Sequence, residues 1–221
     1  MAQYDDTVSI LTSALQREQF PIGEWRRKNS EHGVEVRRLP YYALIPKDPI
    51  QHMRFRHMIR LRCTHDLEFR YHILQACQQD ILFAINTLVY IFEPRPTGRR
   101  LPFNTWSDQD NYICWTKAAM DAGRDIGIEK SRGIGFSYLV LATLLCDWEF
   151  SKQSTIGLVS RKMDGVVDDK ENPDALIWKM NYMHQQMPEW IRKNPDDGKA
   201  VLERNLSTHK FYHRLNDSTV Y

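Results

Sequence analysis

The feature that most constrains this chain is a glycine-bearing loop, residues 130–137, that lies between two apolar segments. Ile126 and Ile128 alternate with other residues before the loop, and an almost continuously apolar stretch, residues 138–150, follows it. A second β-rich run covers residues 154–160. Strand, glycine loop, helix and strand together form a βαβ unit. A glycine loop that opens a helix presents backbone N–H groups and the positive end of the helix dipole to an anion, so the sequence predicts a phosphate-binding loop.

The loop matches the phosphate-loop pattern G-x-x-x-x-G-K-[ST] only in part. Gly135 and Ser137 occupy the last Gly and the Ser/Thr positions, whereas Lys130 stands in the first Gly position and Phe136 in the lysine position. The positive charge that a triphosphate needs is therefore at the front of the loop, in Lys130 and Arg132. Ser137 can offer its hydroxyl to Mg²⁺. The alternative is a tight strand-to-helix turn whose glycines only allow a close backbone approach.

These residues resemble the deviant Walker A loop of the large terminase subunit, the DNA-packaging motor of tailed bacteriophages. Other segments resemble further parts of that family in the same order and spacing. They are residues 77–80, 85–87 and 93–95, residues 101–103 with Gln109, and residues 159–162, 167–168, 176–179 and 187–190. The resemblance runs from about residue 70 to the end, and residues 1–65 carry no motif of this kind.

The resemblance implies an α/β fold, with a P-loop NTPase-type (ASCE-like) parallel-sheet core over residues 66–221 that is incomplete at its C-terminus. A mainly helical N-terminal extension would cover residues 1–65. ATP and Mg²⁺ would bind at the loop, where Lys130 would hold the β- and γ-phosphates and Arg132 would neutralise charge in the transition state. The other nucleotide-binding residues that it implies are Ser131, Gly133, Ile134, Gly135, Phe136, Ser137 (also the residue that contacts Mg²⁺), Gln109 and Phe103.

Gln109 follows the expected helix start at Ser107 and would read the adenine edge through its side-chain amide, with Phe103 or Trp106 packing on the base. An exposed helix glutamine is the alternative. The partners that the resemblance implies are double-stranded DNA, the small terminase subunit, the portal protein and further copies of the chain in a ring. The setting would be the cytoplasm of an infected bacterium.

The chain carries a formal net charge of only +2, so DNA contacts must come from local basic patches. One candidate patch is the alternating segment 51–63, which reads as a strand with one charged face. It contains Arg54, Arg56, Arg60 and Arg62. Arg161 and Lys162 follow the expected strand 154–160 and are placed to meet a phosphate or a neighbouring subunit. A solvated surface is the alternative for both patches.

Spacing and turn signals predict the remaining elements. The four cysteines show no paired spacing, and the sequence has neither a signal peptide nor an apolar run long enough to span a membrane, so we expect a protein that is not secreted. The expected elements are a short docking helix with Val8, Leu11 and Leu15 on one face, one helix over 67–92, a helix from Ser107 to Gly123, a helix that begins at Asn172–Pro173 and ends at Pro188, a turn at 193–198 and a hairpin over 211–220.

ATP hydrolysis in this class also needs an apolar strand that ends in an acid for Mg²⁺, and no segment after the loop has that pattern. Asp147 lies inside the expected helix, and Asp168 follows too short an apolar run. In the family this strand and the nuclease domain lie further along the chain. We therefore expect the front half of a motor ATPase, inactive alone. The alternative is a truncated interaction module that binds nucleotide or DNA without turnover. A helicase-like ATPase would share the loop but not the other matches.

Overall fold

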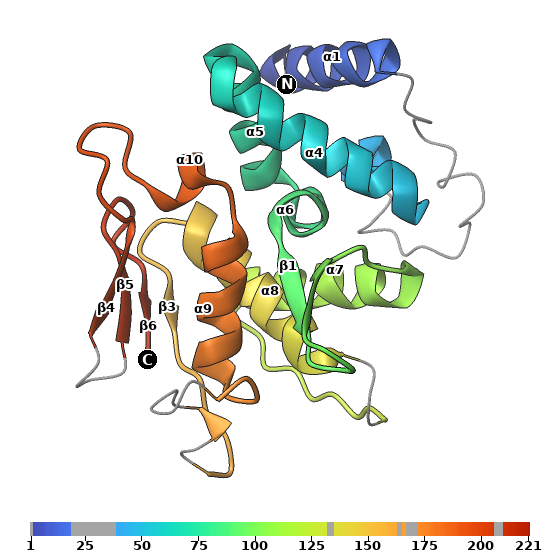
Figure 1. The fold of residues 1–221 in the computed structure, drawn as a ribbon. Helices are drawn as coiled ribbons and strands as arrows, with labels where there is room; N and C mark the ends of the chain where they lie inside the picture. The colour runs from blue at the N-terminus through green and yellow to red at the C-terminus, as the bar shows by residue number, and fades with distance from the viewer. Residues whose placement is uncertain (1, 19–38, 132–134, 163–164, 167–171, 206–209) are drawn as a thin grey trace. The chain divides into compact units, whose positions relative to one another are not determined.

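The computed structural model describes residues 2–18, 39–131, 135–162, 165–166, 172–205 and 210–221. They form a mixed α/β chain that divides into two compact units (Figure 1). The first unit comprises Met1–Thr87 and Asn104–Glu129, and the second comprises Leu88–Phe103 and Lys130–Tyr221. No helix in the described ranges is long and apolar enough to cross a membrane. The four cysteines are buried and none forms a disulfide.

The first unit is helical. Its elements are α1 (Ala2–Arg17), the 3-10 helix η1 (Tyr42–Leu44), α4 (Pro49–His65), α5 (Leu67–Gln79), α6 (Ile81–Leu88) and α7 (Ser107–Asp121). The expected docking helix is confirmed as α1, which contacts α5 and buries Leu11 and Leu15. The first unit extends across the expected boundary at residue 65, because α4 packs against α5.

The expected strand over residues 51–63 is wrong, because this segment is the helix α4. Asp48 caps the helix, since its carboxylate accepts the backbone N–H groups of Ile50 and Gln51 at 3.1 and 3.0 Å, and proline occupies the first helical position. Phe55 and Ile59, four residues apart, are buried. The alternation of arginine with apolar residues therefore does not indicate a strand in this segment.

The single helix expected over residues 67–92 is also wrong. Asp80 divides it, because its buried carboxylate accepts the backbone N–H of Phe83 at 2.9 Å and those of Tyr41 and Tyr42 at 3.1 and 2.7 Å. Asp80 thus ends α5, starts α6 and holds η1 in place. After α6 the chain leaves the helical conformation and forms a strand, β1 (Tyr90–Glu93).

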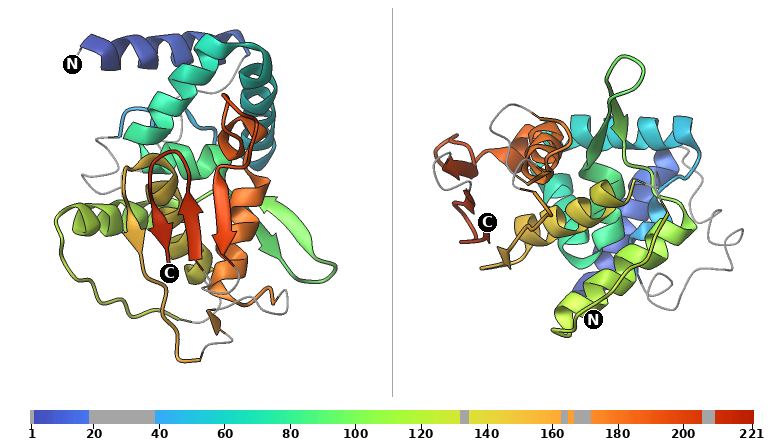
Figure 2. Two further views of the ribbon diagram at one scale, coloured as in Figure 1. Left: turned by 90° about the vertical axis from the view of Figure 1, so that its left-hand side faces the viewer. Right: turned by 90° about the horizontal axis from the view of Figure 1, so that it is seen from below.

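The second unit surrounds one long helix, α8 (Phe136–Phe150). Its other elements are β1, β2 (Arg99–Pro102), β3 (Thr155–Ile156), α9 (Leu176–Gln186), α10 (Glu189–Arg192), β4 (Leu202–Asn205), β5 (Lys210–His213) and β6 (Thr219–Val220). β1 and β2 form an antiparallel ribbon, and the other strands form a sheet in the order β3-β6-β5-β4 (Figures 1 and 2). α8 and α9 contact each other, and β1 contacts α9.

The described sheet is mostly antiparallel, since only β3 and β6 pair in parallel. The expected strand over residues 154–160 is reduced to Thr155–Ile156. The strand expected at Ile126 and Ile128 is wrong, because this segment is neither helix nor strand. A strand requires a neighbour to complete its hydrogen-bond ladder, and none of the described strands pairs with these residues.

Several expected boundaries are confirmed. Gly123 ends α7 with φ +60°, although Ser107 is the first helical residue and not the cap. Met187 and Pro188 follow the end of α9. The turn at 193–198 closes through the backbone N–H of Asn194, which donates to the carbonyl of Lys199 at 2.9 Å. The C-terminal hairpin is the β5–β6 pair. The helix expected from Asn172 starts later, at Leu176.

A buried polar cluster lies where α8, α9 and β5 meet. The Glu149 carboxylate oxygens lie 3.6 Å from His184 Nε2 and 3.4 Å from His213 Nε2. Trp148 lies beside both imidazoles, with ring centroids 5.8 and 4.7 Å away. The backbone N–H of Leu215 donates to His213 Nδ1 at 3.3 Å, so the neutral ring of His213 carries its proton on Nε2, facing Glu149. Of the expected structural histidines, His213 fits this role and His209 lies outside the described residues.

Replacement of Asp80 tests whether its carboxylate holds α5, α6 and η1 together. Asp80→Ala removes three hydrogen-bond acceptor contacts of a buried carboxylate and should lower the free energy of unfolding by about 2–4 kcal/mol, because the backbone donors lose their partners. Denaturant unfolding measures this change. Asp108→Ala, which changes an exposed residue in the first turn of α7, is the matched control and should cost far less. An equal loss in both variants would contradict the role of Asp80.

The buried His52 predicts a pH dependence of stability. Burial, with the positive charges of Arg56 and Lys47, lowers the pKa of His52 to about 3. An unfolded histidine has a pKa of about 6.5. The contribution of His52 is therefore complete above about pH 6.5 and is lost on acidification toward pH 3, at up to about 1.4 kcal/mol per pH unit. Asp80, whose pKa burial raises to about 6, acts in the opposite direction between about pH 4 and 6.

A comparison of variants isolates the contribution of His52. The free energy of unfolding of His52→Gln should fall less steeply than that of the wild type between about pH 6.5 and 4, while the glutamine amide can still donate to the carbonyl of Asn86. His57→Gln, exposed on the same helix, should parallel the wild type. Parallel pH profiles for His52→Gln and the wild type would refute this assignment.

Candidate phosphate-binding loop

Helix α8 begins directly after Gly135, the last glycine of the loop 130–137. Gly135 is the N-cap residue with φ +70°, a left-handed conformation that favours glycine. No side chain caps the first turn at this residue. Its carbonyl accepts the backbone N–H of Leu139 at 3.2 Å, so the helix begins directly after it. The N-cap residue itself therefore offers no side-chain acceptor to the positive end of the helix dipole.

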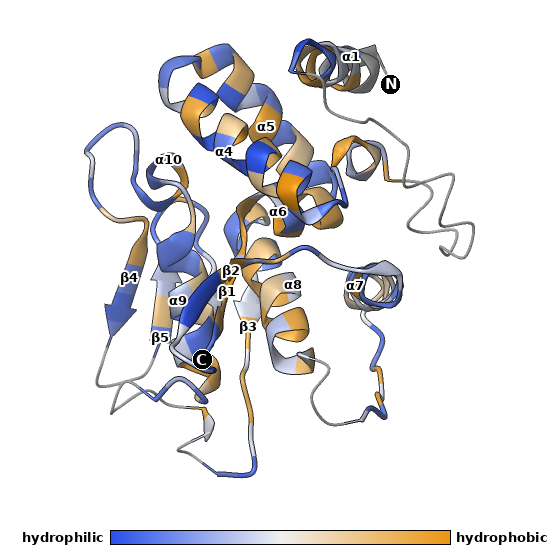
Figure 3. Cartoon of the chain, turned by 45° about the vertical axis from the view of Figure 1, so that its right-hand side comes forward, coloured by the Kyte–Doolittle hydropathy of each residue, from blue (hydrophilic) through white to orange (hydrophobic). Residues whose placement is uncertain are grey.

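The opposite end of α8 is capped. The side-chain amide of Asn216 donates to the carbonyls of Trp148 and Glu149 at 2.8 and 3.1 Å. Ser154 donates its hydroxyl to the Asp147 carboxylate at 2.8 Å and so ties the next segment to the last turn. The body of the helix is largely hydrophobic (Figure 3) and much of it is buried. The C-terminal end of α8 is thus satisfied by side chains of the same unit, whereas at the N-terminal end the N-cap residue, Gly135, has no side chain that could accept a hydrogen bond.

Lys130 brings a positive charge to the start of α8. Its ammonium nitrogen lies 5.8 Å from the ring centroid of Phe136, the first residue of the helix. Ser131 is exposed, as is Ser137 in the first helical turn. The structure thus brings together Lys130, Phe136 and Ser137 around Gly135. Arg132, Gly133 and Ile134 lie outside the described residues.

Phe103 and Gln109 already have roles in the structure. Phe103 is only 5% exposed, and its backbone N–H donates to the carbonyl of Val89 at 3.1 Å. It therefore offers little ring surface to a base. Gln109 lies in the first turn of α7, and its side-chain oxygen accepts the backbone N–H of Trp106 at 3.3 Å. This acceptor is used to cap α7, as expected of a glutamine at this helical position.

The arginines of α4 do not share one face. Arg56 is 1% exposed and donates to the carbonyl of Asn86, so it cannot contact a phosphate, and this expectation is wrong. Arg62 is half-buried, donates to the Asp66 carboxylate at 3.1 Å and lies 4.1 Å from the Phe69 ring centroid. Arg60 is half-buried and Arg54 is exposed. A helix distributes alternating residues around its axis, and this separates the buried Arg56 from the exposed Arg54.

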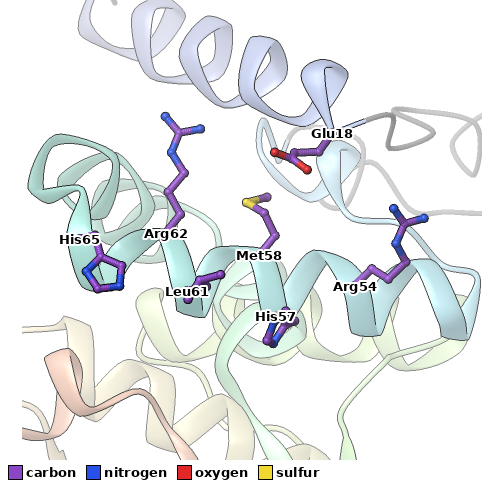
Figure 4. Close-up of a pocket in the computed structure, with 7 residues that line it drawn as sticks. All are labelled: Glu18, Arg54, His57, Met58, Leu61, Arg62 and His65. Atoms are coloured by element: carbon purple, nitrogen blue, oxygen red, sulfur yellow. The ribbon is translucent and has the colours of Figure 1, made fainter.

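Arg54 and Arg62 line a surface hollow of about 390 Å³ beside the end of α1 (Figure 4). The other lining residues are Glu18, His57, Met58, Leu61 and His65. In the second unit, Arg161 and Lys162 are exposed on the segment after β3.

A buried cluster in the first unit was not predicted from the sequence. The Lys47 ammonium donates to the Asn86 side chain at 3.2 Å and lies 3.9 Å from the Asp110 carboxylate, to which Tyr42 and Thr105 donate their hydroxyls. Burial lowers the pKa of Lys47 to about 8 and raises that of the Tyr42 phenol. The five residues are scattered along the chain with no common spacing, so no sequence signal joins them. Because Tyr42 and Asp110 are inaccessible, we interpret the cluster as structural.

Within the described ranges, no group of three or more His, Cys, Asp or Glu side chains is arranged to hold a metal ion. No protein-family model matches the chain, and neither a curated protein nor a solved structure is significantly similar to it. The start of α8 therefore has to be judged on its own geometry.

Proposed function

We propose that this chain is the nucleotide-binding front half of a viral DNA-packaging motor of the large terminase type. In this proposal, ATP bound with Mg²⁺ at the start of α8 supplies the energy that moves double-stranded DNA into a procapsid. The chain would act in a ring of copies, with the small terminase subunit and the portal protein, in the cytoplasm of an infected bacterium. The second unit would form the front of a P-loop-type core.

The observation that carries this proposal is the start of α8, where a glycine N-cap and a lysine cation lie together. Gly135 allows the chain to turn into the helix without a side-chain cap, and Lys130 holds its ammonium beside the first helical residue. Backbone N–H groups, the helix dipole and one cation are the elements that recognise a polyphosphate. Ser137 is exposed in the first turn, where its hydroxyl can contact the bound cation. The ordered motif resemblance over about residues 70–221 supports the same assignment.

A second candidate function is nucleotide binding without turnover. Motor ATPases of this kind place an acid at the carboxyl end of a strand beside the loop. Among the described strands of the four-stranded sheet, β3 is followed in sequence by Gly157, β4 by Leu206, β5 by Arg214 and β6 by Tyr221. These residues offer no carboxylate for Mg²⁺, which favours an interaction module whose catalytic acids are supplied elsewhere.

Nucleotide binding to the purified chain tests the loop. Lys130→Ala should weaken MgATP binding by about tenfold or more, because a charge-assisted hydrogen bond to phosphate contributes about 1.5–3 kcal/mol. Titration calorimetry or a fluorescent ATP analogue measures the affinity. Lys152→Ala removes an exposed cation just after α8 and is the matched control, which should bind like the wild type.

The outcomes separate the two candidate functions. Binding with release of inorganic phosphate supports the motor ATPase, and binding without release supports the module that lacks turnover. If the wild type fails to bind MgATP, or if both lysine variants lose the same affinity, the assignment of the loop is wrong.

A further inference from the structure

The β1–β2 ribbon carries a concentration of arginine that the phosphate loop does not use. Tyr90 pairs with Pro102 and Glu93 with Arg99, so the connecting turn lies at residues 94–98. Gly98 adopts φ +67° in this turn. Arg95, Arg99 and Arg100 are all exposed. We call this ribbon and its three arginines the arginine hairpin.

The arginine hairpin is held firmly on α9. The Phe92 ring packs against Trp178 and Tyr182 with centroids 5.4 and 5.5 Å away, and these two α9 rings stack on each other at 5.1 Å. Arg100 donates to the side-chain oxygen of Gln186 at 3.2 Å, and its guanidinium lies 4.7 Å from the ring centroid of Tyr90. The base of the hairpin is thus anchored, while its turn projects away from α9 (Figure 2, right).

The charge of the hairpin is unbalanced. Between residues 93 and 100 the sequence contains three arginines and one acid, Glu93. The Glu93 carboxylate accepts the backbone N–H of Arg95 at 3.1 Å, which ties it to the start of the turn. The whole chain has a formal net charge of only +2, so this short segment carries a disproportionate share of positive charge.

Phosphate is the chemistry that this surface fits. The planar guanidinium group presents several N–H donors that match phosphate oxygens, and positive charge on an exposed turn favours a polyanion. A two-stranded β-ribbon also has the width to enter the major groove of a duplex. A rigid ribbon with arginines at its end can therefore contact phosphates without a large ordering cost.

We propose that the arginine hairpin binds the phosphate backbone of a nucleic-acid duplex. Its place in a DNA motor rests on the proposed function, but the contact itself requires no nucleotide and none of the loop residues. It makes the hairpin, and not α4, the main duplex-binding surface among the described residues.

Duplex binding without ATP tests this proposal by fluorescence anisotropy of a labelled duplex at several salt concentrations between about 50 and 200 mM. Arg95→Glu/Arg99→Glu should weaken binding by at least about tenfold at the lowest salt and reduce the slope of log affinity against log salt by about two. Arg100 is left unchanged because it helps to anchor the ribbon. Arg95→Gln/Arg99→Gln, which only neutralises the charges, should give a smaller loss in the same direction, and circular dichroism checks the fold of each variant.

Two matched double variants of the second unit serve as comparisons. Lys152→Glu/Lys199→Glu reverses two exposed charges elsewhere and should have little effect, and Arg161→Glu/Lys162→Glu examines the segment after β3. The proposal is overturned if the wild type does not bind the duplex, if the hairpin and Lys152/Lys199 variants lose equal affinity, or if only the Arg161/Lys162 variant loses it. Tighter hairpin-dependent binding of polyglutamate than of the duplex would also overturn it, by indicating an acidic protein partner.

Lys130→Ala separates this result from the proposed function. This variant should bind the duplex like the wild type even where MgATP binding is lost. If the chain binds no nucleotide but the hairpin variant loses the duplex, the hairpin contact stands and only the loop assignment fails.

Discussion

Burial of α8 is the constraint on which the second unit depends. Leu139, Leu145 and Trp148 are almost completely buried, and each large apolar side chain contributes about 1.5–3 kcal/mol when it is removed from water. A helix with apolar residues on most of its circumference must be covered on most sides, and α9 and β3 both contact it. Coverage of the body leaves the helix ends as the places where polar chemistry can occur. One end is capped by Asn216, and the other begins at Gly135 without a side-chain cap.

The C-terminal end of α8 also carries a buried carboxylate in an unfavourable position. Glu149 is buried near the C-terminus of α8, where the helix dipole is negative and a carboxylate is unfavourable. His184 and His213 direct their Nε2 atoms at this carboxylate from two other elements. Burial lowers the pKa of His184, while Glu149 acts in the opposite direction. The polar contacts thus join α8, α9 and β5 at the point where the dipole alone would disfavour the acid.

Local signals predicted the elements whose causes are local. An apolar run after a glycine is sufficient to place α8, and Gly123 ends α7 because a left-handed residue terminates a helix. The errors arose where distant contacts decide. Asp80 interrupts a continuous apolar periodicity, and its carboxylate accepts backbone N–H groups from Tyr41 and Tyr42, which are far away in sequence, as well as from the nearby Phe83. Ile126 and Ile128 have strand-like spacing, but none of the described strands pairs with them. Spacing alone cannot supply the hydrogen-bond ladder that a strand needs.

The difference between local sequence signals and the folded structure also decides which arginines are accessible to a binding partner. In sequence, the arginines of α4 form the longer series, but the backbone of α4 is helical and turns Arg56 into the interior, where it donates to the carbonyl of Asn86. On the β1–β2 ribbon the arginines are fewer, yet the two short strands and the turn keep Arg95 and Arg99 in solvent. A buried guanidinium must be satisfied by the protein itself, whereas an exposed one can exchange water for a phosphate. The number of charges in a segment therefore indicates less about binding than the secondary structure that presents them.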